Sequence, residues 1–249
     1  MIFRQLFEKI SSTYTYLIGS QETGEAILVD PVLPTWERDL EAVSALGLRL
    51  VMTVETHIHA DHVTSAQLLK REVGSKIAGP IMDHLPCTDF KIRDGIAFHV
   101  GDVALLPIHT PGHTDNHMAY LVDDRVLTGD ALLIDGCGRT DFQNGDARAL
   151  HHSITQKLFT LPSDTLVYPA HDYHGRYVSS VAQERKRNPR IGQEKKLEEF
   201  VQIMNKLDLA YPKFIDYAVP GNRACGQCPN DLPEYLQEYC GSMGESLQG

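Results

Sequence analysis

The 249-residue chain lacks the features that mark several specialised classes of protein. No apolar run is long enough to span a bilayer, and no charged segment followed by an apolar one opens the chain, so we expect neither a membrane anchor nor a secretory signal. Lys and Arg number 23 against 33 Asp and Glu, a net charge of −10. Nonspecific binding of nucleic acid requires a basic surface, so this charge argues against it. A cytoplasmic location follows as the default expectation.

Cysteine is also scarce. The five cysteines are widely scattered, at positions 87, 137, 225, 228 and 240. An odd, scattered set is a poor framework for disulfides and fits a reducing compartment. We interpret Cys87 and Cys137 as buried thiols, and the lone Cys225-x-x-Cys228 pair as weak evidence for redox or zinc chemistry.

Alternation and helical periodicity predict a mixed order of short strands and helices. We expect strands at 13–18, 25–30, 48–54, 96–100, 103–108, 118–122, 126–128 and 165–168. We expect four helices. The first runs from an N-cap at Thr35 to Gly47, the second follows His62 and ends at Gly74, the third runs from an N-cap at Asp146 to Pro162, and the fourth covers 197–207. Two sheets packed face to face with helices outside satisfy this order, an α+β fold of the αββα sandwich type. We expect one domain over 1–249, with an irregular C-terminal extension from about residue 209.

Histidine is the most informative residue type that is present. The segment His57-x-His59-x-Asp61-His62 follows a predicted buried strand that ends near Val54. A turn at that place can direct several imidazoles and a carboxylate into one pocket. This combination of ligands suits zinc or iron, so the segment predicts a metal site.

Three later segments repeat the same placement. His113 follows Thr110-Pro-Gly, Asp130 follows Leu127-Thr-Gly, and His171 follows Tyr168-Pro-Ala. Each potential ligand lies where a strand meets a loop, which is where side chains are exposed on a rigid scaffold. Four such segments in one chain strengthen the prediction of a metal site.

This order of residues resembles the metallo-β-lactamase superfamily, and the match spans residues 13 to 175. The resemblance implies the metallo-β-lactamase fold. It places His57, His59 and His113 at one metal position. Asp61, His62 and His171 would face a second position, and Asp130 could bridge the two.

Further segments resemble one branch of that superfamily, the persulfide dioxygenases. The most specific is Gly136-Cys-Gly-Arg-Thr-Asp-Phe142, and others are Phe3–Phe7, Thr56–His62, Gly129–Leu133, Tyr168–His174 and Ile215–Pro220. The resemblance implies oxidation of glutathione persulfide by O₂ to sulfite, with release of glutathione. It implies one ferrous iron per chain on His57, His113 and Asp130, a ligand set that leaves positions open for substrate and O₂.

Other interpretations stay open because four further potential ligands are present: His59, Asp61, His62 and His171. In the persulfide dioxygenase interpretation these four residues orient ligands and tune the metal. They could instead complete the binuclear zinc site of a hydroxyacylglutathione hydrolase of the glyoxalase II type. A non-catalytic persulfide sensor is a third interpretation, against which the complete set of ligands argues.

The resemblance also suggests residues for substrate. Tyr173 is expected close to the iron, where its hydroxyl could hydrogen-bond substrate or oxygen. Glutathione carries two carboxylates, for which Arg139, Arg176 and Arg223 are candidate partners by position, and Cys225 is expected near the substrate. Asn116-His117 departs from the family pattern after His113 and would alter the pocket wall. Relatives suggest a homodimer.

Overall fold

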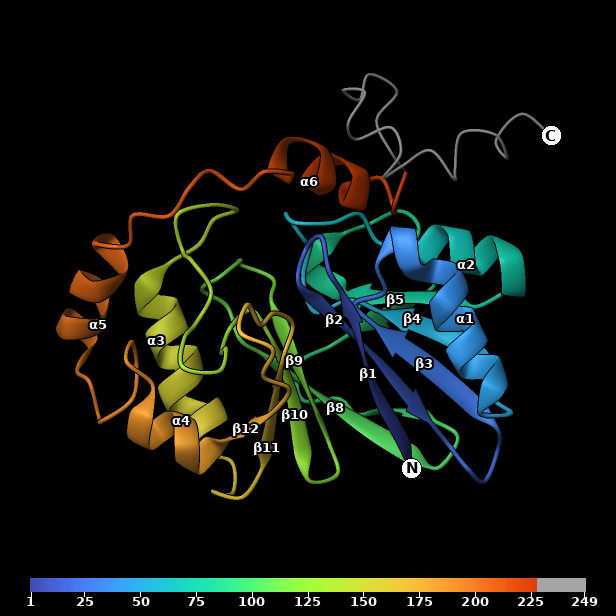
Figure 1. Cartoon of the computed structure of the whole chain (residues 1–249), viewed down its shortest axis with the longest axis horizontal. Coiled ribbons are helices and arrows are strands. Elements are labelled where there is room, and N and C mark those ends of the chain that lie inside the picture. Colours follow the sequence, from blue (N-terminus) through green and yellow to red (C-terminus); the bar gives the residue numbers. More distant parts are fainter. Residues whose placement is uncertain (228–249) are drawn as a thin grey trace. The chain divides into compact units, whose positions relative to one another are not determined.

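The computed structural model describes residues 1–227, which form two six-stranded sheets and their covering helices (Figure 1). The chain divides into two compact units. Unit 1 comprises residues 1–91, 100–103 and the described residues from 211 on, and it holds most of the first sheet. Unit 2 comprises residues 92–99 and 104–210, and it holds most of the second sheet.

The first sheet has the strand order β1-β2-β3-β4-β5-β6. Its strands are β1 (Ile2–Glu8), β2 (Thr13–Gly19), β3 (Glu25–Val29), β4 (Arg49–Val54), β5 (Lys76–Pro80) and β6 (Phe90–Ile92). The pairs β1–β2 and β2–β3 are antiparallel, whereas β3–β4 and β4–β5 are parallel. Since β3 and β4 run parallel with Val29 opposite Val54, the residues that follow them meet at one edge of the sheet.

Two helices of unit 1 cover this sheet with apolar side chains, and a third packs against the second of them. They are α1 (Trp36–Ala45), α2 (Ala66–Val73) and α6 (Ile215–Arg223). Val43 of α1 and Leu69 of α2 pack with Leu28 and Leu50 of the sheet in one buried cluster. Phe214 and Ala218, at and within α6, join a second cluster with Leu33, Val63 and Leu68. Burial of such side chains contributes roughly 1.5–3 kcal/mol each, which holds the elements in place.

The second sheet has the order β12-β11-β10-β9-β8-β7. Its strands are β7 (Phe98–Val100), β8 (Val103–His109), β9 (Met118–Val122), β10 (Arg125–Gly129), β11 (Leu166–Pro169) and β12 (Ser179–Ser180). Only the pair β10–β11, among the pairings described within residues 104–180, is parallel. The helices α3 (Ala147–Gln156), α4 (Val181–Arg187) and α5 (Leu197–Asn205) lie beside it in Figure 1. They share one core cluster with the strands through Leu150, Val181 and Phe200.

The local signals of helix ends were mostly correct. Asp146 caps α3, since its carboxylate accepts from the backbone N–H groups of Arg148 at 2.6 Å and Ala149 at 3.0 Å. Gly74 ends α2 in the left-handed conformation, with φ 72°. Thr35 precedes α1, but its side chain makes no capping hydrogen bond and donates to the Val32 carbonyl instead.

Two expectations for the C-terminal third were wrong. The strand at 165–168 is not the last, because β12 follows it. The region beyond 209 is not irregular throughout, because α6 forms over 215–223 with Pro220 inside it, driven by burial of Ile215 and Ala218. The single-domain boundary over 1–249 stays a prediction. Within residues 1–227 no helix combines the length and apolar composition that crossing a membrane requires.

Candidate metal centre

In unit 1 the buried carboxylate of Asp30 organises the histidine segment. Asp30 directly follows β3, and Thr56 lies two residues beyond β4, so the parallel pairing brings them together. The carboxylate accepts from the Thr56 backbone N–H at 2.7 Å and from its hydroxyl at 2.9 Å. Asp30 is only 1% exposed. Because burial of a charged carboxylate is costly unless it is hydrogen-bonded, these hydrogen bonds are needed to stabilise it.

The same contacts set the tautomer of His57. Its Nδ1 lies 2.9 Å from the Thr56 hydroxyl oxygen. Because that hydroxyl donates its one hydrogen to Asp30, it must accept from His57, so Nδ1 carries the hydrogen. The lone pair of His57 is therefore on Nε2. A chain from imidazole through hydroxyl to carboxylate is the arrangement that orients a metal-binding histidine.

His59 lies between carboxylates. Its Nε2 is 3.1 Å from Asp30 and 3.4 Å from Glu55, with all three side chains largely buried. Burial disfavours a charged imidazole, but the nearby carboxylates, Asp30 foremost, outweigh it and raise the pKa of His59 well above its usual range. The other nitrogen, Nδ1, is buried and has no hydrogen-bond partner among residues 1–227.

The pair Asp61 and His62 completes the segment. Asp61 Oδ2 is 2.9 Å from His62 Nδ1 and accepts from the Thr13 hydroxyl at 2.9 Å. His62 Nε2 is buried, and no hydrogen-bond partner for it lies in the described part of the chain. Donor atoms of His59, Asp61 and His62 lie within 4.8 Å of one another. Buried imidazole nitrogens that make no hydrogen bond among residues 1–227, beside a carboxylate, fit a metal ion.

Asn222 of α6 holds the same segment from the C-terminal side. Its Oδ1 accepts from the Thr64 backbone N–H at 2.8 Å, and its Nδ2 donates to the carbonyls of His59 at 2.9 Å and His62 at 2.8 Å. One buried amide thus satisfies three backbone groups of an irregular loop. The loop owes its shape partly to a residue about 160 positions away in sequence.

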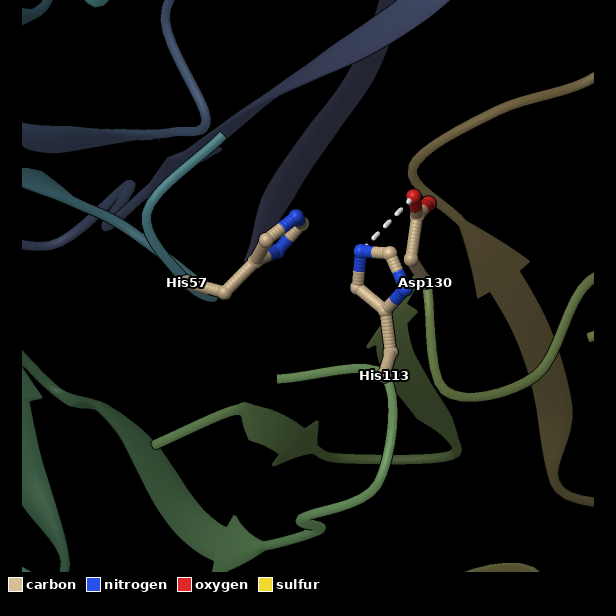
Figure 2. Close-up of side chains that lie close together, drawn as sticks. All are labelled: His57, His113 and Asp130. Atoms are coloured by element: carbon tan, nitrogen blue, oxygen red, sulfur yellow. Dashed lines mark ion pairs between the residues drawn. The ribbon is translucent and has the colours of Figure 1, made fainter. Parts of the chain in front are cut away.

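In unit 2 the arrangement centres on Asp130, which follows β10. His171 follows the parallel neighbour β11, and its Nδ1 lies 2.6 Å from Asp130 Oδ1. His113 Nε2 lies 3.5 Å from Asp130 Oδ2, the contact that is dashed in Figure 2. His117 Nε2 accepts from the Asp130 backbone N–H at 3.0 Å. Three imidazoles therefore contact this one aspartate.

The segment 136–142 positions His113 and Asp130 through its backbone. His113 Nδ1 lies 2.8 Å from the Arg139 carbonyl, so Nδ1 donates and the lone pair is on Nε2, the nitrogen facing Asp130. The Gly138 N–H donates to the Asp130 carbonyl at 2.7 Å. A Cβ at Gly138 would collide with that carbonyl and lie 2.8 Å from His113 Nδ1, so only glycine fits.

Four of the five candidates for substrate contact differ in their surroundings, and the fifth, Cys225, is in a disulfide. Arg139 donates to Asp141 at 2.7 Å and to the Ala210 carbonyl at 2.8 Å, and the hydrogen bond to Asp141 raises the pKa of Arg139. Arg176 donates to Asp172, Asp135 and the Ile134 carbonyl. Arg223 is exposed at the end of α6. Tyr173 is 69% exposed, with its ring stacked at 6.2 Å on that of His171.

The interpretation of the cysteines needs correction. Cys87 is not a plain buried thiol, because it forms a disulfide with Cys225 across 138 positions of sequence. Spacing alone gave no sign of a pair so far apart. Cys137 is a buried free thiol, as expected, and burial raises its pKa to about 11. Cys228, the second member of the Cys-x-x-Cys pair, lies outside the described residues.

Sequence reasoning missed four residues that orient the candidate ligands: Asp30, Thr56, His117 and Asn222. Asp30 and Thr56 did carry a signal, since polar residues directly after two predicted buried strands meet if those strands pair in parallel. His117 stood out only as a departure from the family pattern. Asn222 had no signal, because its contacts depend on where α6 packs.

Comparison with known proteins places this arrangement in a family. Residues 10–171 match the family model described as the metallo-β-lactamase superfamily, and the chain belongs to that superfamily. This confirms the α+β, metallo-β-lactamase fold. Over 234 residues the chain is 48% identical to the protein named persulfide dioxygenase ETHE1, mitochondrial, of Bos taurus, covering 91% of this chain and 89% of that protein. Within the superfamily, the chain belongs to the persulfide dioxygenases.

Two further comparisons bear on the alternatives. The crystal structure of ETHE1 from Myxococcus xanthus is 51% identical, covers 91% of this chain and 100% of its own, and superposes with a TM-score of 0.88. The hydroxyacylglutathione hydrolase of Rhizobium johnstonii is 38% identical over 167 residues, which cover 66% of this chain and 63% of that protein. The likeness to the hydrolase is therefore partial.

Proposed function

We propose that this chain is a persulfide dioxygenase. Glutathione persulfide, O₂ and water would give glutathione, sulfite and two protons, so the terminal sulfur is oxidised and all of the O₂ is reduced. The observation that carries the proposal is the near-full-length likeness to a curated persulfide dioxygenase. The structure of the site is compatible with this proposal, because it contains imidazole and carboxylate groups whose orientation is set by hydrogen bonds.

We further propose that one ferrous iron per chain binds to His57, His113 and Asp130. The two hydrogen bonds that place a lone pair on Nε2 of His57 and of His113 support this ligand set. A face of two histidines and one carboxylate is typical of non-heme iron oxygenases, whose iron offers open positions and electrons to substrate and O₂. The chain's own contribution is to hold these donors in fixed tautomers.

The likeness to a persulfide dioxygenase favours one metal over two. The contacts of the remaining polar residues do not discriminate, because a hydrogen bond from Nδ1 of His171 to Asp130, and of His62 to Asp61, is compatible with either number of metal ions. In this proposal His59, Asp61, His62 and His171 orient ligands, as the sequence suggested. The binuclear hydrolase is retained as the second candidate because donors of His59, Asp61 and His62 lie within 4.8 Å of one another.

Metal content and substrate together decide between the two candidates. Protein produced without added metal should contain one iron per chain and consume O₂ when glutathione persulfide is added. Two zinc ions per chain, hydrolysis of a hydroxyacylglutathione thioester and no O₂ uptake would establish the hydrolase instead. A protein that binds glutathione persulfide without consuming either O₂ or thioester would be the sensor.

For substrate binding, we propose Tyr173 near the reacting sulfur and Arg139, Arg176, Arg223 and Cys225 around the glutathione part. Of the three arginines, Arg223 is the best candidate for binding a glutathione carboxylate, because it is exposed. Arg139 and Arg176 already pair with aspartates. We expect Arg223→Ala to raise KM for glutathione persulfide about tenfold, with kcat within about twofold, since one charge-assisted hydrogen bond contributes roughly 1.5–3 kcal/mol. Arg187→Ala is the control, because Arg187 is a half-exposed arginine that pairs with Asp135 and is not a candidate for substrate binding. An unchanged KM removes Arg223 from the binding set.

The setting of the enzyme is also a proposal. We propose a homodimer in the cytoplasm, although the Bos taurus relative is named as mitochondrial. Molecular mass in solution tests the first part. Fractionation of cells that make the protein tests the second.

A further inference from the structure

The Cys87–Cys225 disulfide lies at the boundary between a surface groove and the interior of unit 1. Both cysteines line a groove of about 510 Å³, together with Gln67, Lys70 and Gln227. Both also line a small cavity of about 20 Å³ whose wall includes His57, His59 and Asn222. A small solute can therefore approach the bond from outside, while its inner side lies next to the histidine segment.

The end of α6 is seated closely on that segment. Asn222 binds the backbone of His59, His62 and Thr64 through three hydrogen bonds of 2.8 to 2.9 Å. Gly226 has φ 85°, and a Cβ there would lie 2.5 Å from the Thr64 carbonyl oxygen. We call residues 221–226 the α6 clamp. Cys225 lies within the clamp, so the disulfide ties it covalently to the loop that carries Cys87.

Reactivity distinguishes this pair from the other described cysteine. Cys137 is 1% exposed in the core of unit 2, and burial raises its pKa to about 11, so it is an inert thiol. Cys87 is half-buried and borders the groove. In reducing compartments, disulfides that form are usually catalytic or redox-sensing rather than structural.

We propose that the Cys87–Cys225 disulfide is an exchange site for low-molecular-weight thiols that controls the α6 clamp. A thiolate attacks one sulfur, forms a mixed disulfide and releases the other cysteine as a thiolate, which takes up a proton. A second thiol attacks the mixed disulfide, so the protein ends with two thiols and the small molecule leaves as its disulfide. Two electrons pass from the two small thiols to the protein.

The consequence for the metal segment is mechanical. With the bond reduced, Asn222 is held only by its hydrogen bonds and by the apolar packing of α6, so His59 and His62 lose part of their support. The effect on turnover rests on the proposed function, whose product glutathione is itself such a thiol. The exchange reaction does not depend on that function.

The first experiment measures the exchange directly. The full chain, in a Cys228→Ser background that removes the neighbouring thiol, is equilibrated with glutathione at different ratios of reduced to oxidised form, then alkylated without unfolding. Mass spectrometry should show Cys87 and Cys225 gaining label together as the ratio rises, with Cys137 unlabelled. Labelling of both cysteines without any reductant would overturn the disulfide, and no labelling at any ratio would overturn exchange.

The second experiment measures the clamp, with Zn²⁺ as a redox-inert probe of the site. Reduction of the protein, or Cys87→Ser, should lower Tm by roughly 5–15 °C and speed release of Zn²⁺ to a chelator several-fold. Asn222→Ala should speed release with the disulfide intact, whereas Arg49→Ala, at an exposed side chain at the start of β4, should not. Unchanged Zn²⁺ release after reduction would overturn the control of the clamp. Neither readout uses persulfide oxidation, so failure of the proposed function would be seen separately.

Discussion

The two units orient their candidate ligands in opposite ways. In unit 1 a carboxylate is the support: Asp30 holds Thr56 and His59, and through Thr56 it sets the tautomer of His57. In unit 2 the carboxylate is itself the candidate ligand, and imidazoles support it, with His117 on the backbone of Asp130 and His171 on its side chain. The comparison shows that a residue type alone does not identify a ligand. The hydrogen bonds around each group indicate which atom it can offer to a metal.

The means of fixing each loop also differ. The histidine segment of unit 1 is held by the side-chain amide of Asn222 from a distant helix. The segment of unit 2 is held by close backbone approach at Gly138. Side-chain support can be removed one group at a time, whereas backbone approach fails as a whole when a Cβ is added.

The largest effect is expected at Asp130, the proposed ligand carboxylate. Asp130→Asn keeps the shape but removes the charge, so we expect loss of most bound iron and a decrease in turnover of more than about 100-fold. His171→Ala removes only a group proposed to support Asp130, so turnover should decrease about tenfold. Iron quantitation and O₂ uptake on the same samples measure both. Equal losses in the two variants would mean that His171 is a ligand as well.

The second-largest effect on metal binding is expected at Gly138, where the backbone packs closely against Asp130. Gly138→Ala forces a Cβ against the Asp130 carbonyl, so we expect a decrease in iron affinity of about 100-fold, with the overall fold retained by circular dichroism. Gly136→Ala is the control, because its Cβ would meet only Leu133 at 3.8 Å. If both variants bound iron normally, the segment 136–142 would not position the site.

The hydroxyl between Asp30 and His57 should have a smaller effect. Thr56→Val removes the hydroxyl at nearly constant volume, so we expect metal affinity to fall about tenfold because His57 loses its oriented tautomer. Thr56→Ser keeps the hydroxyl and should bind metal normally. Calorimetric titration of metal into both variants gives the comparison. Identical affinities for Val and Ser would show that His57 is oriented by other contacts.

No effect on the site is expected from a buried carboxylate away from the histidine segment, Asp39, which should affect stability alone. Burial raises the pKa of Asp39 to about 6, against the opposing effect of Arg38. The folded state then holds this proton more tightly than the unfolded state does, so its contribution to stability is present near pH 4 and is lost as pH rises through 6. Relative to Asp39→Asn, the free energy of unfolding of the wild type should fall by up to about 3 kcal/mol from pH 4 to 7.

Denaturant unfolding at several pH values measures that difference. Metal affinity should be the same in Asp39→Asn and wild type, which separates this carboxylate from Asp30 and Asp130. A pH-independent difference in stability would show that Asp39 is charged in the folded state throughout this range.

Much of the fold could be predicted because its signals are local. Asp146 marked a helix start through its capping carboxylate, and Gly74 marked a helix end through its left-handed backbone. The strands leading to Val54 and Thr128 followed from apolar runs. The predictions failed where tertiary burial outweighed local preference. Pro220 would ordinarily argue against a helix, yet α6 forms around it because Ile215 and Ala218 are buried.

The amino-acid sequence by itself determined the chemistry available: the histidines and aspartates at strand ends, the family to which they belong, and so a metal as the centre of the proposed function. Tertiary structure alone decided how those groups are supported. Asp30 meets Thr56 because β3 and β4 pair in parallel. Asn222 meets His62, and Cys87 meets Cys225, because α6 packs against α2 and the loop before it. Such contacts join residues far apart in the chain, and no local preference of either partner encodes the distance between them.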